Sequence, residues 1–540
     1  MVTQYTRHEL LLRPETFEER MACTHLASKT LWGWDGAAKF WRIPRFALDA
    51  LPEKITKYVP KEPEIEGHNE TVFSLLSLPP HLTPYPYQRP EILNLASGKW
   101  GLWASCGVGK TLCALAAYYV LKKRGSVDGM IVVGPEPGRH VWCGEDSDAQ
   151  KWIHTPGEYV KTGQKTAPTG EIVYITAAKI FRDPYMKWVA DKIRTKRWVL
   201  CVDEADRAAG ALTQRFAVLE NWAKYCSYIW LLTATPVRNY PDSFWGLYTL
   251  LTGHKICYHV WCEWLRNKKK KGWDQDRVKA IGKALSHCTS VVSKEDVAPW
   301  LPPVTNHTIK VPMKGRQREL YTNLVASGRM TLAEQGGKER TVVVKELLHS
   351  LSLMASISSH PIVAKDDEWK DNDIAKLPYL EHILKSHHAE KVCIWSWHPA
   401  VLDWLHSKFP ESVRYHGGVG RNERTEAVRR FNNDDSIRFF FGNPMSAGSS
   451  LNLGAGTVRI YWDLGWSWSE YHQSCERINR ITRKLPLTGY VLMSERTVEE
   501  VMWKAINGKM DLASMAMSGT DATGVFKTQV AEEILDLWKR

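Results

Sequence analysis

Short apolar runs alternate with longer amphipathic stretches in two separate parts of the chain. In the first part, from about residue 83 to 250, the runs are KWGLWAS, GMIVVGP, EIVYIT, RWVLCVDEA and YIWLLTATP. In the second part, from about 376 to 510, they are KVCIWSW, IRFFFGNP, VRIYWDL and GYVLMS. Strands that are apolar throughout and separated by helices are typical of a parallel sheet with helices on both faces. The pattern therefore predicts an α/β protein with two such lobes.

The remaining segments interrupt this rhythm. Near the N-terminus, LWGWDGAAKFWRIP alternates tryptophan with polar residues and favours a small β module, which an acidic, proline-containing linker follows. The middle of the chain shows helical periodicity in GRQRELYTNLVASG and VVVKELLHSLSLMASI, which predicts a helical insertion. We expect an accessory module at 1–75, lobes at 76–254 and 376–515, an insertion with linker at 255–375, and a last amphipathic helix at 516–540.

The composition favours a polyanionic partner in a reducing, aqueous compartment. The 540 residues carry a formal net charge of +13, and a basic chain of this kind attracts nucleic acid above all. The eleven cysteines are an odd number scattered through apolar runs, which is typical of small core residues. The N-terminus lacks the apolar core of a signal peptide, and no apolar run reaches the roughly 20 residues of a membrane span. We expect a cytoplasmic protein without membrane contact, with a nuclear location as the lesser alternative.

The stretch ASCGVGKT at 104–111 predicts a cradle for phosphate groups. A strand precedes it and the helix TLCALAAYYVLKK follows, so backbone N–H groups and a helix N-terminus would face an anion. The glycines allow close approach, the lysine is placed for the β- and γ-phosphates, and the threonine is placed for Mg²⁺. The nucleotide-binding residues predicted here are Ser105, Cys106, Gly107, Val108, Gly109, Lys110 and Thr111.

A second apolar strand, about ninety residues after the loop, ends in the acidic sequence DEAD. We expect Asp203 to hold Mg²⁺ through water, together with Thr111, and Glu204 to orient or deprotonate the attacking water. Thr233 and Thr235, on the next strand, carry hydroxyls that can link the metal site to a moving element. These residue types in this order predict a site for ATP and Mg²⁺.

The motifs A-x-x-G-x-G-K-T, D-E-A-D and T-A-T-P, in this order, resemble those of superfamily two helicases. The resemblance implies two RecA-like P-loop lobes, and Gln88, some twenty residues before the loop, fits the position that reads adenine by paired hydrogen bonds. SEYHQSCERINRITR resembles motif six, and its spacing predicts Gln473, Arg477 and Arg480 on one helix face. The resemblance implies that both arginines reach the γ-phosphate from the second lobe when the lobes close. The predicted catalytic residues are therefore Lys110, Glu204, Arg477 and Arg480.

Further segments resemble the Swi/Snf-type branch of that superfamily over about residues 80–510. They are HCTSVVSKEDVAPWLPPVTNHTIKVPM, the helix RQRELYTNL, the pair His360-Pro361, RYHGGVGRNERTEAVRRFNN, SAGSSLNLGAG as motif five, and TVEEVMWKAI. The chain departs from the branch at Asp206, where histidine is more usual. Ser449 and Ser450 stand in a segment that is usually richer in glycine, and Asn479 and Arg483 replace the usual histidine and glutamine of motif six. These departures suit a compact bacterial or phage member.

Three further signals in the sequence are weaker. GHKICYHVWCEW contains four residues of zinc-ligand type, His254, Cys257, His259 and Cys262, but the first three cannot all face one ion from a regular helix. The lysine run at 267–273 is either a solvated loop or a contact with DNA phosphates. WGWDGAAKFWRIP faintly resembles a module that precedes the motor in some annealing-helicase and phage relatives, which suggests contact with DNA.

These observations predict an ATP-driven motor that holds duplex or branched DNA mainly through its phosphates. Hydrolysis of ATP between the two lobes would move the protein along DNA, and unwinding, annealing and simple translocation stay open as outcomes. The alternatives are an RNA helicase, which D-E-A-D itself suggests, and a scaffold that binds nucleic acid without catalysis.

Overall fold

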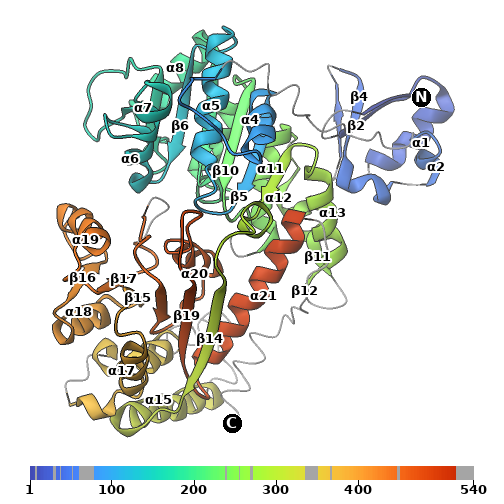
Figure 1. Cartoon of the computed structure of the whole chain (residues 1–540). Helices are drawn as coiled ribbons and strands as arrows, with labels where there is room; N and C mark the ends of the chain where they lie inside the picture. The colour runs from blue at the N-terminus through green and yellow to red at the C-terminus, as the bar shows by residue number, and fades with distance from the viewer. Residues whose placement is uncertain are drawn as a thin grey trace. The chain divides into compact units, whose positions relative to one another are not determined.

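The computed structural model describes residues 1–5, 9–27, 32–36, 38–51, 53–59, 78–237, 240–254, 256–267, 272–334, 351–364, 368–446 and 451–518. These residues form two compact units, one within Met1–Val297 together with residues 511–518 and the other within Ala298–Met510. Figure 1 traces the chain and labels its elements. In this described part of the chain, no helix is both long and apolar enough to cross a bilayer.

The N-terminal module is a four-stranded antiparallel sheet in the order β1-β2-β4-β3. Leu10, Leu12 and Ile43 alternate along their strands and point to one fully buried side. This sheet agrees with the β structure predicted for the N-terminal segment. Its elements are β1 (Val2–Tyr5), β2 (Glu9–Arg13), α1 (Phe17–Ala27), β3 (Gly33–Asp35), β4 (Phe40–Pro44), η1 (Arg45–Ala50) and α2 (Glu53–Thr56).

Buried polar contacts join the module to the rest of its unit. His254, which follows α11 (Phe244–Thr252), lies with Nδ1 2.6 Å from Oε1 of Glu9. Arg42 donates two hydrogen bonds to the other carboxylate oxygen of Glu9, at 2.9 and 2.8 Å. Burial opposes the ionisation of Glu9, but the hydrogen bonds from His254 and Arg42 outweigh it and lower the pKa of Glu9. The module is therefore an integral part of the first unit.

The first unit contains a seven-stranded sheet in the order β13-β5-β10-β9-β6-β8-β7. Every pairing in it is parallel, so the carboxyl ends of the strands share one edge. Two groups of packed helices flank the sheet, α4 with α5 and α7, and α8 with α10 and α11. The strands are β5 (Lys99–Ala104), β6 (Gly129–Gly134), β7 (Glu158–Tyr159), β8 (Ile172–Thr176), β9 (Trp198–Asp203), β10 (Tyr228–Thr233) and β13 (Thr289–Val292), and the helices are α4 (Gln88–Ala96), α5 (Lys110–Lys123), α7 (Asp148–Ile153), α8 (Tyr185–Thr195) and α10 (Gln214–Ala223).

The segment predicted as a helical insertion, 255–375, contains four described strands as well as helices, so it is not purely helical. β11 (Arg266–Asn267) and β12 (Gly272–Trp273) form a short antiparallel pair. β13 pairs with β5 in the first sheet, and β14 (Val304–Val311) pairs with β19 (Leu487–Ser494) in the second. β13 is only four residues long, and β14 is an edge strand whose residues are mostly exposed, so neither forms an apolar run. The helices of the segment are α12 (Tyr258–Leu265), α13 (Gln275–Leu285), α14 (Lys294–Val297) and α15 (Gly315–Glu334).

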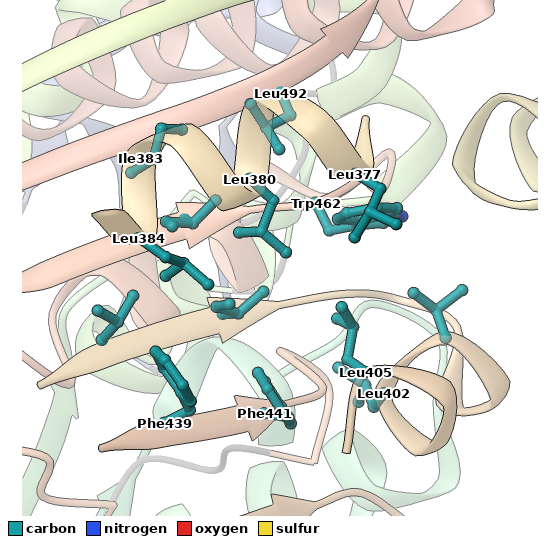
Figure 2. Packing of buried hydrophobic residues seen from close by; sticks show 14 of the residues in the cluster. Leu377, Leu380, Ile383, Leu384, Leu402, Leu405, Phe439, Phe441, Trp462 and Leu492 are labelled. Carbon is teal, nitrogen blue, oxygen red and sulfur yellow. The ribbon is translucent and has the colours of Figure 1, made fainter. Parts of the chain in front are cut away.

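The second unit contains a six-stranded parallel sheet in the order β14-β19-β18-β15-β17-β16. Leucines of α17 and α18 pack against Phe439 and Phe441 of β17 and against Trp462, and form a buried cluster (Figure 2). Two parallel sheets flanked by helices confirm the predicted α/β class. The remaining elements are α17 (Leu377–Ser386), β15 (Val392–Trp395), α18 (Pro399–Lys408), β16 (Ser412–Tyr415), α19 (Arg421–Asn433), β17 (Phe439–Gly442), β18 (Val458–Tyr461), α20 (Trp468–Cys475) and α21 (Val498–Ser518).

Several predicted features lie outside the described residues. They are the linker over 60–77, the lysines at 268–271, the serines at 449 and 450, and the expected last helix from residue 519 onward.

Candidate nucleotide-binding site

The predicted phosphate loop lies between β5, which ends at Ala104, and α5, which begins at Lys110. Gly107 and Gly109 have φ angles of 85° and 96°, which glycine adopts without steric cost. A Cβ at position 109 would also lie 2.2 Å from Nε2 of Gln88, so a side chain there would displace the Gln88 amide. Cys106 and Val108 are buried and hold the loop against the core. The strand, loop and helix are those that the sequence predicts.

Lys110 places its ammonium group over the start of the loop. Nζ donates to the carbonyl of Ala104 at 2.6 Å and to that of Ser105 at 3.2 Å. Thr111 follows in the first turn of α5, where the helix N-terminus contributes a partial positive charge. The loop therefore concentrates a cation, backbone N–H groups and a helix end in one place, which is the chemistry that a phosphate group requires.

Gln88 is buried beside the loop, and both ends of its amide are engaged. Nε2 donates to the carbonyl of Val108 at 2.9 Å, and Oε1 accepts from the backbone N–H of Tyr85 at 2.9 Å. The Tyr87 hydroxyl donates to the same Val108 carbonyl at 3.1 Å. Gln88 thus supports the phosphate loop, a role that the sequence did not predict, while its reading of adenine stays a prediction.

Asp203 ends β9 at the edge of the sheet where β5 also ends. Its Oδ2 accepts from Nε1 of Trp142 at 3.1 Å, and its Oδ1 accepts from the N–H of Glu204 at 3.1 Å. Burial and the neighbouring Glu204 raise the pKa of Asp203 to about 6, and Trp142 and Lys110 oppose this shift. β5 and β9 are both parallel neighbours of β10, so the phosphate loop after β5 and the acidic end of β9 leave the sheet at the same edge.

Glu204 is held in an unusual conformation next to this carboxylate. Its backbone is left-handed, with φ 52° and ψ 54°, which costs free energy for a residue with a side chain. The side chain is buried, and Oε2 has no hydrogen-bond partner among the residues that the structure describes. A buried carboxylate oxygen without a donor is rare in folded proteins and is typical of a group that acts on a ligand or a water molecule.

Asp206, the last residue of the DEAD sequence, connects this site to β10. It accepts hydrogen bonds from the hydroxyls of Thr233, at 2.7 Å, and Thr235, at 3.4 Å, and both threonines are fully buried. The sequence predicted that the threonine hydroxyls would link elements but did not name their partner. The carboxylate at position 206, where the Swi/Snf-type branch more often has histidine, was the available signal.

Motif six of the second unit departs from the prediction that its polar residues share one helix face. α20 ends at Cys475, so Gln473 lies on the helix, Arg477 lies in the turn that follows it, and Arg480 lies in the irregular segment after that turn. The chain leaves the helix there because the N–H of Arg477 bonds to the carbonyl of Ser474, at 3.3 Å, in a turn. Arg477 is fully buried, and Arg480 donates from Nη2 to the carbonyl of Leu451. Both arginines are therefore positioned by contacts within their own unit.

The side chains of the first unit fit a nucleotide with a divalent cation. Asp203 and Thr111 supply few protein oxygens, which suits Mg²⁺ because this ion keeps several of its waters. In the described ranges, no three or more His, Cys, Asp or Glu side chains gather into a metal site. His254, one member of the zinc-ligand set considered above, is instead the ion-pair partner of Glu9.

Comparison with known families finds two domains in this chain. Residues 102–363 match the SNF2-related domain, and residues 375–482 match the helicase conserved C-terminal domain. The first match begins in β5 and covers the phosphate loop and the DEAD sequence. The second covers motif six and most of the second sheet.

Curated relatives match most of this chain at low identity. The human SWI/SNF-related matrix-associated actin-dependent regulator of chromatin subfamily A member 1 is 25% identical over 76% of this chain and 41% of its own length. The DNA repair and recombination protein RAD54 of Saccharomyces cerevisiae is 23% identical over 77% and 53%, and the mouse DNA annealing helicase and endonuclease ZRANB3 is 22% identical over 84% and 42%. The chain thus spans about half the length of these relatives, or less.

Among solved structures, the Sulfolobus solfataricus SWI2/SNF2 ATPase core in complex with double-stranded DNA is 21% identical and matches 82% of this chain and 95% of that chain. The TM-score of 0.38 is too low to support an argument about this chain.

Proposed function

Since this chain belongs to the family that combines an SNF2-related domain with a helicase conserved C-terminal domain, we propose that it hydrolyses ATP and uses the reaction to move along DNA. The observation that carries the proposal is the shared site at the edge of the first sheet. There the loop that carries Lys110 follows β5 and the carboxylate of Asp203 ends β9, on the two strands that pair with β10, and the buried Glu204 comes next in the chain. A phosphate-binding cation, a metal-binding carboxylate and a second carboxylate are the parts that phosphoryl transfer to water requires.

Each residue of the site has a separate task in this proposal. The backbone N–H groups of the loop and Lys110 hold the phosphate chain, and Gln88 faces the adenine ring while supporting the loop. Thr111 and Asp203 would hold Mg²⁺, which neutralises charge on the phosphate oxygens when it is bound. Glu204 orients the attacking water and accepts its proton, since its Oε2 is not used by any described neighbour.

Arg477 and Arg480 complete the proposed reaction from the second unit. A guanidinium group that reaches the γ-phosphate stabilises the charge of the transition state and makes hydrolysis depend on the approach of the two units. That dependence would couple each hydrolysis to a change in the grip on DNA. Both arginines follow the end of α20 in the chain, and in this proposal they approach the nucleotide from there.

DNA is the proposed partner because of charge and because of the relatives. The names of RAD54 and ZRANB3 describe actions on DNA, and the net charge of +13 suits a polyanion. We propose that duplex or branched DNA is bound mainly through phosphates, so binding should fall steeply with salt. Unwinding, annealing and translocation are separate outcomes for the same motor.

A panel of ATPase assays tests the proposal. Hydrolysis is measured with duplex DNA, single-stranded DNA, RNA and no nucleic acid, beside strand-displacement and annealing assays. Stimulation by DNA supports the proposal, and stimulation by RNA alone would replace it with an RNA helicase. A rate near zero under every condition, from protein that still binds DNA, would favour a scaffold.

A further inference from the structure

The carboxylate of Asp203 is held by a tryptophan that lies outside the predicted site. Trp142 is the last residue of α6 (Arg139–Trp142), the short helix that follows β6. Its Nε1 donates to Oδ2 of Asp203 at 3.1 Å, and its side chain is fully buried. β6 and β9 are parallel neighbours with Val133 opposite Val202, so the segments that follow them leave the sheet at the same edge. The indole N–H therefore reaches the end of β9 from the adjacent strand.

The position of Trp142 is fixed by its own backbone contacts. Its carbonyl accepts from the N–H of Gly157 at 2.8 Å, and a parallel bridge joins Cys143 to Gly157. A Cβ at Gly157 would lie 2.6 Å from the Trp142 carbonyl oxygen, so this close approach requires glycine. The backbone of Trp142 is thus held by its carbonyl, and its indole is packed in the core.

The segment between β6 and α6 leaves space for this contact. The Tyr174 hydroxyl donates to the carbonyl of Pro135 at 2.6 Å and holds the segment in place. A Cβ at Gly138 would lie 2.7 Å from that hydroxyl and 3.7 Å from Oδ2 of Asp203. Glycine at position 138 therefore leaves room for the Tyr174 hydroxyl close to the Asp203 carboxylate.

We propose that Trp142 is a positioning residue for magnesium binding: its indole N–H fixes the rotation of the Asp203 carboxylate so that the remaining lone pairs face the Mg²⁺ of a bound nucleotide. The inference rests on the proposed function, because it assigns Asp203 to the metal. With Trp142 on Oδ2 and the N–H of Glu204 on Oδ1, one donor holds each oxygen and two defined directions are left for water on the metal. Partners of this kind behind a metal ligand commonly change metal affinity by about 10–100-fold.

The test compares nucleotide binding with and without magnesium in Trp142→Phe. Calorimetry measures the affinity of the protein for ADP in excess Mg²⁺ and again in EDTA. We expect the variant to lose about tenfold of the strengthening that Mg²⁺ gives, while its affinity for ADP in EDTA is unchanged. The Mg²⁺ concentration for half-maximal ATP hydrolysis should rise by about the same factor.

Trp198→Phe is the matched control. Trp198 is buried at the start of the same strand, β9, and its Nε1 has no hydrogen-bond partner in the described part of the chain. This variant should keep the magnesium dependence of wild type. In the Asp203→Asn background, Trp142→Phe should add no further loss, because the two residues act through one contact.

A measurement on the wild-type protein tests the same contact if Trp142→Phe fails to fold. With ¹⁵N-labelled tryptophan, paramagnetic Mn²⁺ added to the ADP complex should broaden an indole N–H resonance that diamagnetic Mg²⁺ leaves sharp. Wild-type magnesium dependence in Trp142→Phe, an equal loss with and without Mg²⁺, or indole signals untouched by Mn²⁺ would overturn the inference alone. Failure of the wild-type protein to bind ADP at all would overturn the proposed function first.

Discussion

The phosphate loop of the first unit and the arginine segment of the second differ in how their chain geometry is determined. In the loop, each feature has a local cause, because Gly107 and Gly109 need positive φ angles and α5 begins directly at Lys110. In the arginine segment, the spacing of Arg477 and Arg480 suggests a helix that in fact ends at Cys475. The difference teaches that backbone-bound anion sites are visible in sequence, whereas side chains held by irregular turns depend on tertiary contacts.

Among the substitutions that test this comparison, Lys110→Ala should cause the largest loss of activity. Without the ammonium group, nucleotide affinity should fall and hydrolysis should decrease by at least about 10³-fold, because the loop loses the cation that Lys110 places at its start. ATPase assays and ADP calorimetry measure the two losses. Lys122→Ala, at the opposite end of α5, is the control and should retain both properties. Wild-type turnover in Lys110→Ala would refute the loop assignment.

Arg480→Ala should separate the two regions most clearly. We expect ATP binding near that of wild type and a decrease in turnover of roughly 10³-fold, since the guanidinium acts on the transition state rather than on the bound nucleotide. Single-turnover hydrolysis beside equilibrium binding gives the comparison. Arg496→Ala, whose side chain is 90% exposed, is a charge-matched control. A variant that keeps its rate would show that the arginine segment is not part of the catalytic site.

Asp206→Asn tests whether the nucleotide site of the first unit is coupled to the binding of DNA. The amide keeps an acceptor for one threonine but loses the charge that both Thr233 and Thr235 face, so DNA-independent hydrolysis should change little. Stimulation by DNA should fall about tenfold, in line with the loss of one charge-assisted hydrogen bond. The ratio of rates with and without DNA is the readout, and Asp191→Asn on the exposed side of α8 serves for comparison. Equal loss of both rates would point to a purely structural role.

Gln88→Ala should have the smallest effect of the four. The loop loses one hydrogen bond to Val108, which corresponds to a change of about 2–10-fold in nucleotide affinity. If Gln88 also reads adenine, discrimination between ATP and GTP should fall as well, and competition assays with both nucleotides measure it. An unchanged preference together with weaker binding of both would restrict Gln88 to supporting the loop. Gln214→Ala, at an exposed position that opens α10, should change neither property.

The parts of the fold that the sequence predicts are those marked by a regular pattern of apolar residues or by a local requirement of the backbone. Buried apolar strands such as β6 and β9 predict a parallel sheet, and the spacing of the glycines predicts the loop between β5 and α5. The strands β13 and β14 carry no such pattern, because β13 is only four residues long and β14 is mostly exposed. Likewise, neither glycine nor proline marks the end of α20 at Cys475.

Residues that act through a partner were the least predictable. Trp142 is one of 25 tryptophans, and only its contact with Asp203 distinguishes its indole from those that fill the core. The support that Gln88 gives to Val108 depends on the close packing of α4 against the phosphate loop. Such roles arise from distances between segments, which residue spacing along the chain does not encode.

The buried Glu9–His254 contact has a practical consequence for anyone who wishes to trim this protein. Deleting the first sixty residues would strip a carboxylate from an imidazole that is 7% exposed and would bring the ring of Tyr248 beside it into water. Poor solubility or low activity of a shortened protein would then result from the exposure of His254 and Tyr248, and would not show that the deleted segment has a function of its own. Substitutions on the exposed surface of the N-terminal sheet, such as at Trp34, leave the Glu9–His254 contact intact and therefore test the function of the module more directly.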